Sequence, residues 1–119
     1  MGDLDEFRIL LFDQRHDALR SIAELGGAIE SIVSAREGSN SDDEHDPEGA
    51  TLAFERSQSD ALLRQAVQRL DDIDAALARL EQGSFGACVV CGRPIARARL
   101  RARPHAATCI RCAENVPLR

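Results

Sequence analysis

The sequence predicts a mainly α-helical protein: a long antiparallel helical hairpin, or coiled coil, followed by a small four-cysteine module. Two stretches with the apolar spacing of long helices, residues 3–36 and 47–82, predict the two arms. A polar segment between them predicts a connecting loop, and paired cysteines near the C-terminus predict a bound metal. We therefore divide the chain into a coiled-coil hairpin, residues 1–82 with a tip loop at 37–49, and a zinc finger, residues 83–119.

The first predicted helix, residues 3–36, has two apolar stripes. One stripe repeats strictly every seventh residue, at Leu4, Leu11, Ala18, Leu25 and Ile32. The other begins at Phe7 and moves one position round the helix by Ile22 and Ile29. This drift is expected when a helix of about 3.6 residues per turn carries a 3.5-residue repeat. The pair Gly26-Gly27 interrupts the pattern and lowers the helix propensity.

The segment 37–49 predicts an acidic loop at the tip of the hairpin. It contains six acidic residues and no basic one, and its glycine, serine, asparagine and proline residues disfavour both helix and strand. At its end, Asp46 is well placed to cap the next helix, with Pro47 at the first helical position. One interpretation is a solvated turn that keeps the hairpin soluble, and the other is a functional cluster of carboxylates.

The second predicted helix, residues 47–82, has an apolar seam that alternates spacings of three and four. The seam consists of Leu63, Ala66, Leu70, Ile73, Leu77 and Leu80. Gly83 then supplies a C-terminal stop. Two helices of similar length joined by a short link predict an antiparallel hairpin, with an arm about 50 Å long.

The four cysteines predict one structural zinc ion per chain. Cys88 and Cys91 form one C-x-x-C pair, and Cys109 and Cys112 form a second pair after 17 intervening residues. Each pair can supply two thiolates from one tight turn, for which Gly92 is suited. Redox dithiols or disulfides are the alternatives, but a redox C-x-x-C normally opens a helix in an alternating strand–helix pattern, and no such pattern precedes Cys88. Four thiolates leave no position for an activated water, so we expect no hydrolytic zinc chemistry. The sequence also shows no Ser/His/Asp or Cys/His set and no glycine-rich phosphate loop, so we expect no enzyme.

The net charge of −5 conceals two regions of opposite sign. Residues 1–87 hold 19 acidic and 8 basic side chains, whereas residues 88–119 hold seven arginines and only Glu114. The arginines near the cysteines are Arg93, Arg97, Arg99, Arg101, Arg103 and Arg111. They can offset the negative charge of a zinc tetrathiolate, or form a basic surface that meets an acidic protein or phosphates. The sequence shows no signal peptide and no transmembrane run, and metal-type cysteines fit the reducing cytoplasm.

The stretch from Glu81 to Ala113 resembles the DksA/TraR family of bacterial zinc-finger transcription regulators. The resemblance rests on the lead-in Gly83-Ser-Phe-Gly86, on the cysteine spacing, and on Arg103-Pro104 before the second cysteine pair. It extends over residues 46–113, and for the first helix it rests on the architecture alone.

The resemblance implies that the protein binds RNA polymerase rather than promoter DNA. In this family the hairpin enters the secondary channel of the polymerase and the zinc module docks at the channel rim, which alters transcription initiation during the stringent response. It also implies that tip acids act near the active-site magnesium, here Asp43, Asp46 and Glu48. The family pattern D-x-x-D-x-A is matched in part, in two alternative readings. Read from Asp43, both acids are present and Glu48 replaces the alanine. Read from Asp46, Gly49 replaces the second acid and Thr51 replaces the alanine.

The resemblance further implies a contact between basic residues and the regulator ppGpp. Arg103 matches one of the family's basic positions, and two positions that carry lysine in well-studied members fall at Asp72 and Ala113.

Two other classes of function remain open from the residues themselves. One is a nucleic-acid-binding zinc finger, against which stand the acidic hairpin and the lack of an aromatic stacking platform. The other is a structural coiled-coil adaptor without polymerase activity. A pull-down that retains core RNA polymerase would distinguish a polymerase-binding regulator from these two classes.

Overall fold

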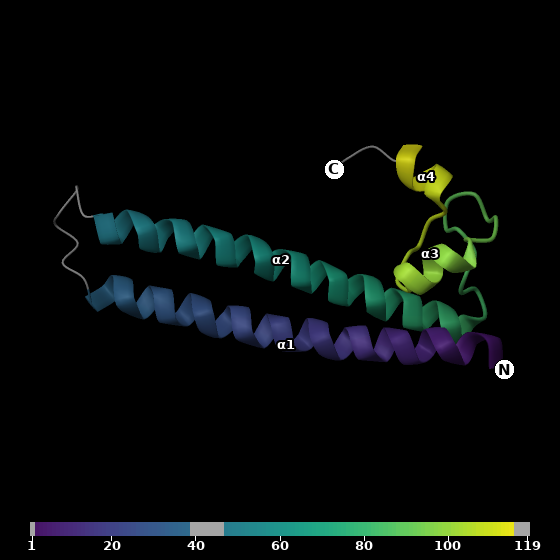
Figure 1. Cartoon of the computed structure of the whole chain (residues 1–119), viewed down its shortest axis with the longest axis horizontal. Coiled ribbons are helices and arrows are strands. Elements are labelled where there is room, and N and C mark those ends of the chain that lie inside the picture. The colour runs from purple at the N-terminus through teal and green to yellow at the C-terminus, as the bar shows by residue number, and fades with distance from the viewer. Residues whose placement is uncertain (1, 39–46, 116–119) are drawn as a thin grey trace. The chain divides into compact units, whose positions relative to one another are not determined.

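The computed structural model describes residues 2–38 and 47–115 (Figure 1). Within these ranges, four helices follow one another: α1 (Gly2–Gly38), α2 (Pro47–Gln82), α3 (Arg97–Ala102) and α4 (Ile110–Asn115). Between α2 and α3, an isolated antiparallel bridge joins Ala87 and Pro94. The predicted fold class is confirmed. The loop predicted at 37–49 is shorter than expected, because α1 continues to Gly38 and α2 begins at Pro47. The tip residues Asp43 and Asp46 lie outside the described residues, as does the side chain of Glu48.

The chain forms two compact units. One combines α1 up to His16 with the chain from Leu70 onward, and the other spans Asp17–Arg69. Within each unit the segments of α1 and α2 run antiparallel (Figure 1). None of the described helices combines the length and the apolar content that a bilayer-spanning segment requires.

The unit Asp17–Arg69 is a pair of helical segments with small residues at its centre. Ala18 and Ala66 are buried, and Leu25 and Leu63 are half-buried. Helix α1 continues through Gly26 and Gly27, and a Cβ atom added at either position would meet no atom within 4 Å. Close packing therefore does not require glycine at these two positions.

Of the residues whose burial the structure describes, most of the buried ones lie in the other unit. Phe7, Leu11, Ile73 and Pro104 have less than 2% of their surface exposed. The predicted seam of α2 lies on the buried side, because Ile73 and Leu80 are buried and Leu70 and Leu77 are half-buried. Ala76, which the seam did not include, is fully buried.

Helix α2 ends where Gly83 was predicted to stop it. The backbone N–H of Ser84 donates to the carbonyl of Arg79 at 2.9 Å, and that of Gly83 donates to Leu80 at 3.4 Å. Gly83 has a φ of 78°, in the left-handed region. This pair of bonds is a Schellman motif, which satisfies the last carbonyls of the helix and turns the chain toward the cysteines.

Candidate metal centre

The first cysteine pair lies on a tight turn. The backbone N–H of Gly92 donates to the carbonyl of Cys88 at 2.9 Å, and that of Cys88 donates to Arg93 at 2.8 Å. Gly92 has a φ of 76°, a conformation that side chains with a Cβ atom rarely adopt. The turn brings Cys88 and Cys91 to the same side, which is the role predicted for this glycine.

The second cysteine pair is positioned by the start of α4. Cys109 directly precedes α4 and Cys112 lies in its first turn, and the N–H of Ala113 donates to the carbonyl of Cys109 at 2.9 Å. Two hydrogen bonds hold the segment before Cys109 in place. The N–H of Val89 donates to Ala107 at 2.9 Å, and the Nε of Arg99 donates to the carbonyl of Thr108 at 2.9 Å.

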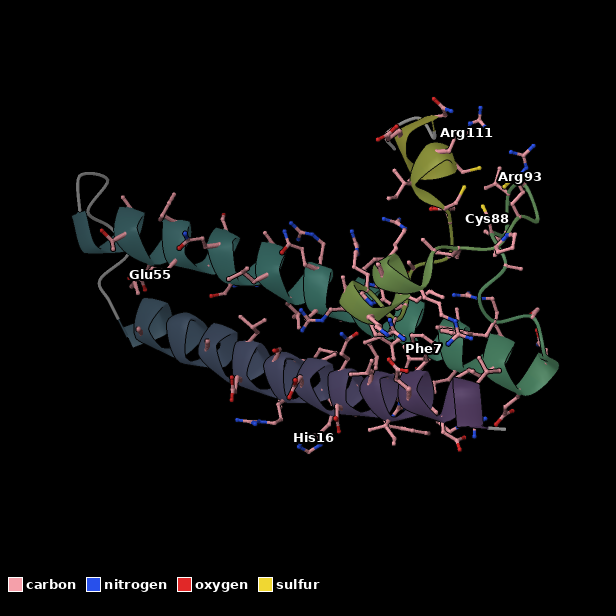
Figure 2. All side chains as sticks on the ribbon, turned by 45° about the vertical axis from the view of Figure 1, so that its right-hand side comes forward. Phe7, His16, Glu55, Cys88, Arg93 and Arg111 are labelled. Carbon is pink, nitrogen blue, oxygen red and sulfur yellow. The ribbon has the colours of Figure 1, made fainter. Side chains whose placement is uncertain are left out.

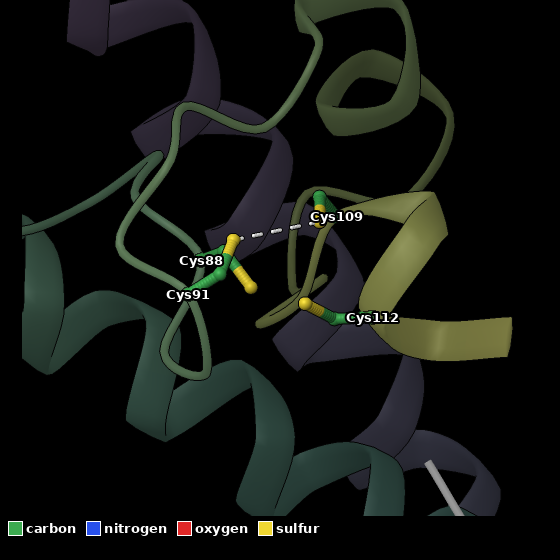
Figure 3. Close-up of side chains that lie close together, drawn as sticks. All are labelled: Cys88, Cys91, Cys109 and Cys112. Atoms are coloured by element: carbon green, nitrogen blue, oxygen red, sulfur yellow. Dashed lines mark hydrogen bonds between the residues drawn. The ribbon is translucent and has the colours of Figure 1, made fainter. Parts of the chain in front are cut away.

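The four sulfur atoms form one cluster (Figure 3). They all lie within 4.8 Å of one another, and the Sγ atoms of Cys91 and Cys109 are 3.9 Å apart. Tetrahedral zinc with Zn–S bonds of about 2.3 Å requires sulfurs about 3.8 Å apart, so the cluster fits the ion. The cysteines are free thiols, since a disulfide requires an S–S distance of about 2.05 Å.

Hydrogen bonds and burial shift the pKa values of the cysteine thiols in opposite directions. The pKa of Cys88 is lowered to about 6, chiefly by the backbone N–H of Cys91 and further by those of Cys109 and Val90. The pKa of Cys112 is raised to about 12, chiefly by its hydrogen bond with the Cys109 side chain and also by burial. Without a metal, the four neighbouring sulfurs cannot all be thiolates. A divalent cation at the centre removes this conflict, because it stabilises all four negative charges.

An apolar cluster supports the sulfurs, and it includes a residue from α1. Phe7, Cys88, Ile95 and Leu100 are buried together, and the partly buried side chains that pack against them are Leu4, Leu10, Phe85, Cys109 and Cys112. Sequence reasoning assigned Phe7 to the seam of the hairpin, but the structure places it in the core of the zinc module (Figure 2). The heptad pattern could not reveal this, because the pattern marks an apolar face without identifying what covers it.

Several arginines of the zinc module make structural contacts. The Nε of Arg101 donates to Glu6 at 2.8 Å, and the guanidinium of Arg97 lies 6.0 Å from the centre of the Phe7 ring. Both contacts run to α1, so these side chains join the module to the first turns of that helix. Arg93 and Arg111 are exposed near the cysteines (Figure 2).

Arg103 lines a cavity of about 380 Å³ together with Asp72 and Ala113, the two other positions that the family resemblance marks for a ppGpp contact. Arg79, Arg99 and His105 also line this cavity. The Nη2 atom of Arg79 is buried without a hydrogen-bond partner. Burial lowers the pKa of Arg79, while Asp72 acts in the opposite direction. The structure thus brings the three predicted positions together, and it adds three basic side chains that sequence reasoning had not placed there.

Comparison with known proteins supports a zinc site at the four cysteines. The family model of the prokaryotic dksA/traR C4-type zinc finger matches residues 83–116. An uncharacterised protein of Aquifex aeolicus is 35% identical over 65 residues, which are 55% of this chain and 45% of that protein. The RNA polymerase-binding transcription factor DksA of Caulobacter vibrioides is 47% identical over 46 residues, which are 39% of this chain and 32% of that protein. The chain therefore spans less than half the length of these curated relatives.

A solved structure matches over a larger part of the chain. The transcription factor DksA2 of Pseudomonas aeruginosa is 31% identical, with a TM-score of 0.79, and the match covers 97% of this chain and 83% of that one. The likeness includes the helical hairpin as well as the C-terminal module. Together with the four clustered thiols, it establishes zinc as the metal and shows that the chain belongs to the DksA/TraR family of C4-type zinc-finger proteins.

Proposed function

We propose that this protein is a bacterial transcription regulator that binds RNA polymerase through its secondary channel and modulates initiation. The likeness to DksA2 over 97% of the chain is the observation that supports the proposal most strongly. The Caulobacter relative is named for polymerase binding, which supports the same partner. The protein acts in the cytoplasm, with no membrane partner and no sequence-specific DNA contact, and it is a regulator rather than an enzyme.

The zinc module and the hairpin have separate tasks in this proposal. Cys88, Cys91, Cys109 and Cys112 hold one zinc ion, which offsets the thiolate charges and closes the module. Because all four positions of the ion are taken by sulfur, the zinc serves structure and not catalysis. The module docks at the rim of the channel, and the hairpin, residues 1–82, carries its acidic tip, residues 37–49, toward the catalytic centre.

The tip contributes negative charge close to the catalytic magnesium of the polymerase. Asp43, Asp46 and Glu48 are the carboxylates proposed for this role, and the support comes from the sequence of the tip loop. Carboxylates so concentrated are best accommodated beside cations, which a polymerase active site provides.

The cavity beside Arg103 is the proposed site of the ppGpp-type contact. Arg99 and Arg103 bring positive charge to it, as phosphate groups require. Asp72 opposes them, and Ala113 offers neither charge nor a hydrogen bond from its side chain. We therefore expect ppGpp to strengthen the effect of this protein on initiation only slightly.

The experiment that tests the proposal is retention of core RNA polymerase by the immobilised, zinc-loaded protein. Polymerase retained in near-stoichiometric amount, with cross-links from the tip loop to residues lining the secondary channel, is the expected result. Retention of DNA or RNA alone, with strong salt dependence, would instead support a nucleic-acid-binding zinc finger. Retention of neither would leave a coiled-coil adaptor. A denatured sample of the same chain serves as the control for non-specific capture.

A further inference from the structure

An aromatic side chain of α1, Phe7, is buried next to the cysteines of the metal centre. Phe7 lies in the second turn of α1, at the opposite end of the sequence from the cysteines. Nevertheless only 1% of its surface is exposed, and it is buried in one cluster with Cys88, Ile95 and Leu100. Cys109 and Cys112 pack against the same cluster, so both cysteine pairs share the support that Phe7 provides.

The contacts of the Phe7 ring run to the zinc module. The ring of Phe85, just before the first cysteine pair, is 5.4 Å from it at a tilt of 39°. The guanidinium of Arg97 lies 6.0 Å from the ring centre, and Leu100 of α3 belongs to the same buried cluster. The ion pair between Glu6 and Arg101, at 2.8 Å, holds the adjacent turn of α1 to α3. Phe7 is therefore fixed against the segments before and between the two cysteine pairs.

The zinc module has few large apolar side chains of its own with which to organise the sulfurs. Between residues 83 and 115, the buried residues are Cys88, Ile95, Leu100, Pro104 and Ala106. A segment with so small a core is poorly ordered without its metal, so much of its conformational entropy is lost when the metal binds. Phe7 adds a fully buried aromatic ring and so lowers the free-energy cost of bringing the two cysteine pairs together.

We propose that Phe7 is a positioning residue for the zinc site, and that α1 and the metal are thermodynamically coupled through it. Phe7 does not touch the ion; it acts through Cys88 and the apolar cluster. Because such coupling is reciprocal, loss of Phe7 weakens zinc binding, and loss of zinc loosens the first turns of α1. Residues 83–119 alone are then an incomplete zinc finger.

The test measures zinc affinity in the full chain, by competition with a chromogenic chelator, for the parent and three variants. Phe7→Ala should weaken zinc binding about 10–100-fold, as is typical when support of metal ligands is lost. Phe7→Leu keeps most of the apolar volume and should recover most of the affinity. Phe12→Ala removes a phenylalanine from the same helix that is 54% exposed, and it should bind zinc as the parent does.

Two further measurements separate positioning from a general loss of stability. Ile73→Ala removes a fully buried side chain of α2 that lies outside the Phe7 cluster, and it should leave zinc affinity close to that of the parent. Cobalt loading reports the geometry of the site, and Phe7→Ala should alter the ligand-field spectrum of tetrahedral cobalt while Ile73→Ala should not. Parent-like zinc affinity in Phe7→Ala, or equal losses in Phe7→Ala and Ile73→Ala, would overturn the proposal. If Phe7→Ala does not fold, Phe7→Leu and Phe7→Val provide the same comparison, with affinity falling as the side chain becomes smaller.

Discussion

At the scale of single residues, the metal site needs both thiol ligands and a left-handed backbone conformation in the turn that carries the first cysteine pair. The thiols supply charge that a metal can neutralise, and Gly92 supplies a backbone conformation that allows the thiols to converge. Both requirements could be predicted from the C-x-x-C-G pattern, because ligand type and left-handed backbone each restrict the choice of residue strongly.

Replacement of Cys109 by serine should remove most of the zinc. A serine hydroxyl stays protonated at neutral pH and is a poor zinc ligand, so the site keeps only three thiolates. We expect the metal content of Cys109→Ser, measured by atomic emission, to fall far below one zinc per chain, with a loss of helical signal in circular dichroism. Val90→Ser is the matched control, because Val90 lies between two cysteines and is 62% exposed. Full zinc and full folding in Cys109→Ser would contradict the assignment of this ligand.

Replacement of Gly92 by alanine should destabilise the protein by about 1–2 kcal/mol, the usual cost of a left-handed backbone for a residue with a Cβ atom. The cost comes from the local backbone and not from packing, because a Cβ atom at this position meets no atom beyond its chain neighbours within 4 Å. Urea unfolding of the zinc-loaded protein, followed by circular dichroism, measures it. Gly92→Asn should lose less, since asparagine tolerates this conformation. Equal stability of Gly92→Ala and the parent would mean that the turn has another backbone conformation.

At the scale of helices, apolar spacing predicted where α1 and α2 lie but only part of what each face contacts. The seam positions Ala66, Ile73 and Leu80 are buried as predicted. Ala76 is fully buried although the seam passed over it, and Leu77 beside it is only half-buried. A heptad pattern locates the buried stripe to within a residue either side, and it does not say how wide the stripe becomes where α3 and its flanking loops add further cover.

Truncation of Ile73 tests whether the seam carries the stability of the helices. Ile73 has no exposed surface, so Ile73→Ala should reduce the free energy of unfolding by about 2–5 kcal/mol. Val67→Ala on the same helix should change it by no more than about 0.5 kcal/mol, because Val67 is 42% exposed. Urea denaturation of both variants gives the comparison. Equal effects of the two substitutions would mean that the buried face of α2 is wrongly assigned.

Replacement of Gly27 by alanine should stabilise the protein, whereas the replacement of Gly92 by alanine should destabilise it. Gly27 lies inside α1 and is exposed, and a methyl group added there would meet no atom within 4 Å. Alanine should therefore stabilise the helix by about 0.5–1 kcal/mol through its lower conformational entropy in the unfolded chain. A higher midpoint in urea is the expected result. A loss of stability would show that α1 needs the freedom of glycine there.

At the scale of the whole molecule, sequence reasoning identified the metal centre and the hairpin but not how the two are joined. Phe7 could be placed on an apolar stripe, yet only the three-dimensional arrangement shows that it is buried in one cluster with Cys88. Likewise, Arg79 and His105 reach the cavity beside Arg103 from α2 and from the loop after α3. Contacts between residues so distant in sequence leave no periodic signal, so they could not be derived from spacing or composition.

Neutralisation of Asp46 tests the functional role proposed for the tip loop. The sequence predicts Asp46 as the N-cap of the second helix as well as a carboxylate near the polymerase active site. Asn is nearly as good an N-cap as Asp, so Asp46→Asn removes charge while preserving the helix start, whereas alanine would add a capping loss of about 0.5–2 kcal/mol. We expect Asp46→Asn to retain zinc, helicity and polymerase affinity but to weaken the effect on initiation.

Run-off transcription at a promoter with a short-lived open complex, across a titration of each variant, provides the measurement. A second variant in which all six acids of residues 37–49 are neutralised should have a still weaker effect on initiation. Polymerase binding should survive in both variants, because the zinc module and the hairpin shaft provide the docking surfaces in this proposal. If both variants act on initiation as the parent does, the tip is a solubilising turn, and the polymerase contact must work through the module and the shaft alone.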